Sequence, residues 1–308
     1  MLFTLFIIVM ITFILVHMLP REMPVEKNLQ AVIAQRWEAL GYNKPIMTQF
    51  GIYLKNIFTK WDFGTSWYIA PRKGAWEVLE SGFLPTLLVN LYSMILAVPV
   101  GIALGVYAAI RKNKWDDSFI STIVMVFISV PSYVYAFLVQ YTLYFKLGWL
   151  PLTMYSLADA GGSYFTWKMF VSMIPAILAL SFGSIAGYTR FVRAELTESL
   201  TSEYMLLART KGLTRAEATA RHALKNAMVP VLPNILSEFV GLLSGSLIIE
   251  QIFSIPGVGQ LYIKSLNLFD YDVFMIDCVF YTFVYLLAGI VLDLSYGFID
   301  PRIRMGER

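Results

Sequence analysis

The chain has 308 residues, of which 57% are hydrophobic and 15% are charged, and its formal net charge is +3. Soluble globular domains carry about 25% charged residues, so this composition excludes an ordinary soluble protein. The small net charge argues against a basic nucleic-acid-binding surface. One cysteine and two histidines argue against a cysteine-rich or histidine-rich metal centre.

Six segments are long and apolar enough to be transmembrane helices, since about 20 apolar residues cross a hydrocarbon core of about 30 Å. They are residues 1–20, 81–110, 118–145, 169–189, 229–253 and 274–298. The first lacks a basic leader and a small-residue cleavage site before Arg21, so we expect a retained helix rather than a signal peptide. The sequence therefore predicts an all-α, polytopic membrane protein with six spans.

The orientation follows from the lysines and arginines of the short loops, which favour the cytoplasm. They cluster after the second span, between the fourth and fifth spans, and at the C-terminus, whereas loops 148–168 and 254–273 carry one lysine each. We therefore expect both termini in the cytoplasm. Four parts are predicted: a first helix (1–20), an ordered extracytoplasmic cap (21–82), a five-helix core (83–298) and a cytoplasmic tail (299–308).

Small residues and prolines recur inside the spans. Glycines lie four residues apart at Gly101 and Gly105, Gly183 and Gly187, and Gly241 and Gly245. Such pairs let helices approach closely, either within this chain or against a second membrane subunit. Prolines predict helix kinks at Pro99, Pro131 and Pro175.

The cytoplasmic segment 190–227 carries the signals of two helices joined by a glycine. Ser202 is placed to cap the first helix, and Gly212 is placed to end it. Thr214 and Glu217 have the spacing of a capping box that opens the second helix. We expect Pro230 and Pro233 to disrupt that second helix.

The first of these helices is unusually apolar for a cytoplasmic surface, with hydrophobic residues at every position from Tyr204 to Ala208. One interpretation places this face in the lipid interface. The other makes the helix a docking element for a cytoplasmic partner, with Ala208 and Gly212 kept small for close approach.

These residues resemble a known pattern. The motifs are Glu203–Leu213, Arg221–Ala227 with Pro230–Leu232, Glu250–Leu261 and Asp300–Arg304. The first two resemble the cytoplasmic signature of ABC importer permeases, most closely the oligopeptide, dipeptide and nickel branch, and the last two are further matches to the same family in the right order. The resemblance covers essentially the whole chain, best from Gly82 onward. Leu206 and Leu207 replace the Glu and first Ala of the general importer pattern.

The resemblance implies a type I ABC importer permease fold in a bacterial or archaeal cell membrane. It makes the apolar cytoplasmic helix the coupling helix, with these contact residues for an ATPase: Glu203, Tyr204, Leu207, Ala208, Arg209, Lys211 and Gly212. The implied partners are a related permease subunit, two ATPase subunits and an extracytoplasmic binding protein. The sequence has no Gly-x-x-x-x-Gly-Lys-Ser/Thr loop, so ATP and magnesium are expected on the ATPases, and this chain is not expected to be an enzyme.

The sequence does not single out one transported solute. Peptides are favoured because the chain offers no cluster of imidazole or soft ligands, and nickel complexes or another small solute are the alternative. Four polar residues are candidates for the translocation path: Glu238, Gln140, Asn90 and Ser129.

Two other functional classes compete with an importer. Intramembrane acids such as Glu238 and Asp277 also suit an ion-driven secondary carrier. An intramembrane protease is disfavoured because Tyr271-Asp272 has no Gly-x-Gly-Asp partner and Ser244 has no histidine in a neighbouring span.

Overall fold

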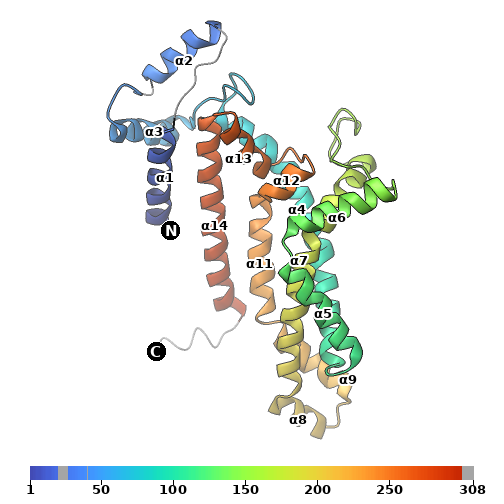
Figure 1. Ribbon diagram of the computed structural model, residues 1–308. Coiled ribbons are helices and arrows are strands. Elements are labelled where there is room, and N and C mark those ends of the chain that lie inside the picture. Colours follow the sequence, from blue (N-terminus) through green and yellow to red (C-terminus); the bar gives the residue numbers. More distant parts are fainter. Residues whose placement is uncertain (20–26, 40, 300–308) are drawn as a thin grey trace, which may run out of the picture. The chain divides into compact units, whose positions relative to one another are not determined.

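The computed structural model describes residues 1–19, 27–39 and 41–299 (Figure 1). Within them the chain is helical apart from loops and an isolated β-bridge between Thr65 and Gly74. The α-helices are α1 (Leu2–His17), α2 (Lys27–Ala39), α3 (Ile46–Lys60), α4 (Ala75–Ile110), α5 (Trp115–Ser129), α6 (Ser132–Gln140), α7 (Trp167–Leu200), α8 (Glu203–Thr210), α9 (Arg215–Ala218), α10 (Leu224–Ala227), α11 (Val231–Val240), α12 (Leu247–Ile252), α13 (Val258–Asn267) and α14 (Tyr271–Ile299). Two π-helical segments (η1, Tyr141–Lys146; η2, Thr219–Ala223) and one 3-10 segment (η3, Gly241–Ser244) complete the helical elements.

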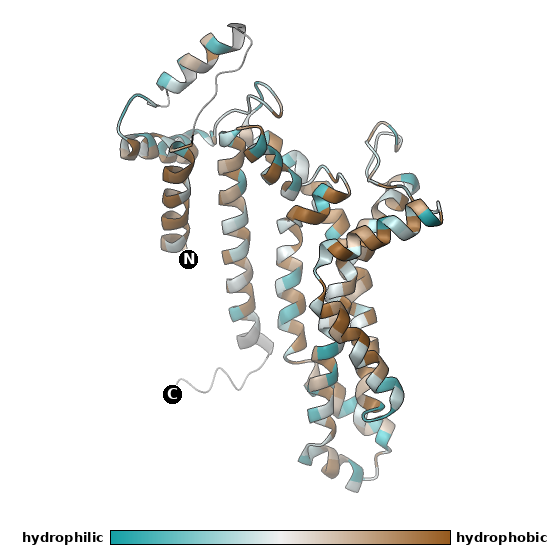
Figure 2. Ribbon diagram, in the orientation of Figure 1, coloured by the Kyte–Doolittle hydropathy of each residue, from teal (hydrophilic) through white to brown (hydrophobic). Residues whose placement is uncertain are grey.

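Three helices of the described residues are individually long and apolar enough to cross a membrane: α4, α7 and α14. Two bent pairs pass the same test together, 115–129 with 132–146 and 215–227 with 231–244, and α1 is a shorter apolar helix. Figure 2 shows that hydrophobic residues cover much of α5 and α6. The all-α membrane architecture expected from the sequence is confirmed.

Two of the predicted spans are interrupted in the structure. Segment 118–145 is not one straight helix, because α5 and α6 differ in direction by 101° around Pro131. Segment 229–253 is divided between α11, η3 and α12. The kink predicted at Pro131 is thus confirmed as a break, whereas α4 and α7 run on as helices through Pro99 and Pro175.

The chain divides into two compact units. The first unit comprises 1–86, 244–247 and 256–286, and the second comprises 87–243, 248–255 and 287–308. The long helices α4 and α14 contribute residues to both units. Each unit has its own apolar core.

In the first unit, one side of α1 is buried. Val9, Phe13 and Val16 pack with Phe50 of α3 and with residues of α14. A second cluster joins Phe63 and the first turns of α4 to α13 and α14. The segment from Ile46 to Gly74 therefore contributes residues to both apolar clusters of this unit.

In the second unit, α7 is the central helix. Met169, Met173 and Ala176 of α7 pack with residues of α4, α6 and α12. At Gly101 of α4 an added Cβ would lie 2.6 Å from the Tyr188 Cβ, and at Gly105 2.8 Å from the Thr189 carbonyl oxygen. This glycine pair therefore packs within the chain, as one of the two interpretations expected, while Gly183, Gly187 and Gly241 have no heavy atom within 4 Å of an added Cβ.

Candidate functional site

The predicted cytoplasmic helix is present as α8. Ser202 occupies the N-cap position, but its hydroxyl donates to the Ser199 carbonyl at 2.6 Å and does not cap α8. The expectation of a side-chain cap at Ser202 is therefore wrong. Glu203 lies in the first turn and Arg209 in the last, where each charge complements the helix dipole.

The C-terminal end of α8 is closed by backbone hydrogen bonds. The Gly212 amide donates to Arg209 at 3.0 Å and the Leu213 amide to Ala208 at 3.3 Å, which is the Schellman pattern. Gly212 has a φ of +90°, a conformation that side-chain-bearing residues avoid. The predicted role of Gly212 as the glycine that ends the helix is confirmed.

The next helix opens with the predicted capping box. The Thr214 hydroxyl accepts from the Glu217 amide at 3.3 Å, and the Glu217 carboxylate accepts from the Thr214 amide at 2.9 Å. The helix then runs through η2 and α10 to Ala227, and α11 starts after Pro230. The predicted second helix therefore ends before Pro230. Pro233 lies in the first turn of α11 and does not disrupt α11, because residues in the first turn of a helix need no amide donor.

The side chains of α8 face two ways. Met205 and Ala208 are buried among Leu196, Ala218 and Ala223, in a cluster contributed by α7 and the helices after α8. Leu206 and Leu207 are 66% and 55% exposed, and Tyr204 is 37% exposed. We call Tyr204, Leu206 and Leu207 the outer face of α8.

This division corrects one predicted contact and adds another. Ala208 is small because it packs inside this chain, so it is not on the surface that a partner would meet. Leu206 was absent from the predicted set but is exposed. Positions 205 and 208 are three apart, hence on one face, which leaves 206 and 207 pointing away. The other predicted members, Glu203, Arg209, Lys211 and Gly212, are exposed beside the outer face.

Partial burial acts to raise the pKa of the Tyr204 hydroxyl, but the neighbouring polar side chains of Ser199, Ser202 and Asn226 act in the opposite direction, and the pKa is lowered. The outer face is carried by a helix whose C-terminal end is closed by backbone hydrogen bonds and whose other face is buried through Met205 and Ala208.

Replacing Gly212 with alanine should loosen the joint between α8 and α9. A side chain at this φ costs about 1–2 kcal/mol, and no atom lies within 4 Å of the added Cβ, so the cost is backbone strain rather than a clash. We expect faster limited proteolysis between residues 205 and 217, with thermal unfolding of the whole chain unchanged. The matched control is Gly187→Ala in α7, which also adds a Cβ to open space but needs no unusual φ. Equal protease sensitivity in the two variants would contradict this role.

The four candidate path residues make separate hydrogen bonds. Glu238 of α11 accepts from the hydroxyls of Tyr188 and Ser184 on α7. The Asn90 amide donates to Leu242 at 2.9 Å, and the Gln140 amide donates to Leu152 at 3.0 Å. Ser129 donates to Met125 within its own helix. The bonds of Glu238, Asn90 and Gln140 connect separate structural elements within the second unit.

A buried ion pair near the start of α5 was not predicted. Arg193 of α7 donates to both carboxylate oxygens of Asp117, from Nε at 2.6 Å and from Nη2 at 2.8 Å, and the Asn113 amide also donates to Asp117 at 2.9 Å. Asp117 is 2% exposed. The pair fixes the loop after α4 to the helix that leads into α8.

In the first unit, two carboxylates hold the loop before α4. Asp270 is buried and accepts from the Ser66 hydroxyl at 2.6 Å and from the Tyr68 and Ile69 amides at 3.1 and 3.0 Å. Asp272 accepts from the Thr65 amide at 2.9 Å. A Cβ at Gly64 would lie 2.5 Å from the Asp272 carboxyl, so only glycine fits there.

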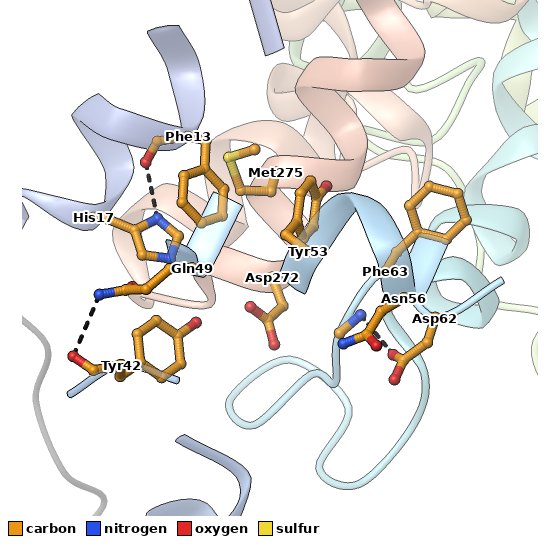
Figure 3. A pocket seen from close by; sticks show the side chains of 11 residues that line it. Phe13, His17, Tyr42, Gln49, Tyr53, Asn56, Asp62, Phe63, Asp272 and Met275 are labelled. Atoms are coloured by element: carbon orange, nitrogen blue, oxygen red, sulfur yellow. Dashed lines mark hydrogen bonds between the residues drawn. The ribbon is translucent and has the colours of Figure 1, made fainter. Parts of the chain in front are cut away.

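A small cavity, shown in Figure 3, lies beside Asp272 and has a volume of about 20 Å³. His17 donates to the Phe13 carbonyl at 2.8 Å at its edge, and Gln49, Tyr53 and Asp272 line it. This space matches about one water molecule, so it does not suit an organic cargo. Among the described residues, no group of three or more His, Cys, Asp or Glu side chains is placed to hold a metal ion.

Residues 101–305 match the family described as "Binding-protein-dependent transport system inner membrane component". The chain is 33% identical to the glutathione transport system permease protein GsiC of Salmonella typhimurium and of Escherichia coli K12, covering 98% of this chain and 95% of each relative. A structure of the inward-facing MetNI methionine ABC transporter shares the fold, with a TM-score of 0.56 and 17% identity over 73% of this chain and 97% of that chain.

Proposed function

Because the chain belongs to the family of binding-protein-dependent transport system inner membrane components, it is a permease subunit of an ABC importer, and we propose that its cargo is a short peptide. The observation that carries this proposal is the nearly full-length similarity to permeases named for glutathione, a tripeptide. Nickel complexes, the alternative, have no comparable support in the described residues, where no ligand cluster is present.

The proposed coupling element is α8. Two cytoplasmic ATPase subunits serve the complex, one of them receiving the outer face of this chain and the other the equivalent helix of a second, related permease. An extracytoplasmic binding protein delivers the cargo. The support is physical, since three large hydrophobic side chains project from a helix whose C-terminal end is closed by backbone hydrogen bonds and whose opposite face is buried in this chain.

Movement of the ATPases would pass into the membrane through α7. This helix is continuous from Trp167 to Leu200, and its buried Leu196 lies in the same cluster as Met205 and Ala208 of α8. A displaced α8 therefore displaces the end of α7 unless the shared cluster is broken. ATP and magnesium bind to the ATPases, and in this arrangement both termini of this chain lie in the cytoplasm.

Reconstituted transport tests the proposal. Proteoliposomes holding the permease pair, the ATPases and the binding protein should accumulate a labelled dipeptide or glutathione when ATP is supplied, with the proton gradient clamped at zero. ATP-driven uptake of a nickel chelate alone would contradict the peptide cargo. Uptake that follows an imposed proton gradient without ATP would favour the secondary carrier instead.

A further inference from the structure

An open groove lies on the second unit between the end of α4, the end of α7 and the helices that follow α8. Its volume is about 520 Å³, within the range of sites for small molecules. Its lining combines apolar and basic residues: Val106, Ile110, Leu200, Ala216, Thr219, Ala220 and Leu224 with Arg111, Lys114 and Arg215.

The charges of the groove are not fully neutralised by the protein. Arg111 forms an ion pair with Asp116 at 2.9 Å, and its guanidinium lies 5.9 Å from the ring centre of Tyr107. Lys114 and Arg215 are exposed and form no ion pair with any residue that the structure describes. The nearby carboxylate of Asp117 is occupied by Arg193. The groove thus keeps an excess of positive charge that complements an anion.

The apolar wall of the groove continues a membrane-crossing helix. Val106 and Ile110 belong to the last turns of α4, and Ile110 is 47% exposed. Trp115, at the first residue of α5, is 78% exposed, and tryptophan is enriched where a membrane meets water. A ligand that contacts both the apolar wall and the basic side chains of the groove needs an anionic group joined to a hydrocarbon chain.

The geometry points to a binding site for an anionic phospholipid, with the headgroup phosphate between Lys114 and Arg215 and an acyl chain along Val106 and Ile110. The site rests on the proposed orientation, which places this end of α4 at the cytoplasmic leaflet. Basic pockets at the cytoplasmic ends of transmembrane helices suit anionic headgroups for the same electrostatic reason. No step of the proposed transport cycle requires this lipid.

Lipid retention measured by native mass spectrometry tests the site. The purified full-length chain, with the subunits that co-purify, is mixed with phosphatidylglycerol or with zwitterionic phosphatidylcholine. The variant K114Q/R215Q should retain phosphatidylglycerol about 30-fold less tightly, because two cations are removed. The control K112Q/K225Q removes two exposed cations outside the groove and should behave as the unmodified chain. The proposal would be overturned if K114Q/R215Q kept the phosphatidylglycerol affinity of the unmodified chain, or if both variants lost affinity to the same extent.

A second comparison separates a lipid from a free phosphate. Ala220→Phe fills the wall of the groove and should weaken phosphatidylglycerol binding without adding affinity for inorganic phosphate. Inorganic phosphate binding as tightly as the lipid would assign the groove to a soluble anion and overturn the proposal. Loss of the ATPase subunits from K114Q/R215Q with lipid retention unchanged would assign the groove to a protein interface and overturn it too. The measurement needs no transport, so its failure differs from failure of the import function.

Discussion

Replacing Asp117 with alanine should lower the free energy of unfolding by about 3 kcal/mol, the lower end of the range for breaking a buried ion pair. Asp117 is almost fully buried, and its removal leaves the Arg193 guanidinium without its bidentate partner. The lower end applies because the Arg193 side chain is 32% exposed and keeps some hydration. Thermal unfolding of the purified chain in detergent, with the fraction that elutes as a folded species, measures the effect.

The adjacent acid supplies the control for this prediction. Asp116 also pairs with an arginine, but the Arg111 side chain is 45% exposed, so Asp116→Ala should cost no more than about 1 kcal/mol. The double variant Asp117→Leu with Arg193→Leu should recover much of the loss, because a matched apolar pair leaves no buried charge. Equal losses in the two alanine variants would contradict a special role for Asp117.

Leu207→Asp should separate transport from folding. Leu207 is on the outer face of α8, so a charge there stays hydrated in the isolated chain but is buried without a partner in a docked complex. An unpaired polar group buried in an interface costs about 2 kcal/mol or more, so we expect ATPase retention and ATP-driven uptake to fall by about 30-fold.

The control for Leu207 is Leu157→Asp, which adds the same charge at an exposed leucine on the side predicted to be extracytoplasmic. It should leave ATPase retention unchanged, and both variants should unfold at the temperature of the unmodified chain. Full ATPase retention in Leu207→Asp would remove the outer face of α8 from the docking surface.

The local signals in the sequence predicted much of the cytoplasmic segment. Gly212 and the Thr214–Glu217 box act between residues at most a few positions apart, so their spacing alone specifies the geometry. The apolar helices were also predictable, because each is a continuous run of hydrophobic residues. Composition does not, however, distinguish a straight span from a bent one. The 101° turn at Pro131 and the division of 229–253 therefore appear only in the structure.

Contacts between residues far apart in the chain could not be predicted from the sequence. Asp117 meets Arg193 across 76 positions, and Asp270 meets Ser66 across 204. Hydrophobic periodicity carries no information about which charged residues will face each other once the helices pack. The burial of Ala208 was missed for a related reason, since its partners Leu196, Ala218 and Ala223 belong to other helices. The C-terminal motif from Asp300 to Arg304 lies outside the described residues.

Site-specific cross-linking tests the central claim most directly, that α8 of this chain contacts an ATPase subunit. The chain has one cysteine, Cys278, so Cys278→Ala removes the native thiol and Leu207→Cys then places a single thiol on the outer face. With a short maleimide–photoreactive linker, we expect a covalent product of this chain with the ATPase, and none from Leu157→Cys in the same background. An assembled complex with active transport that gives no ATPase product from position 207 would contradict the account.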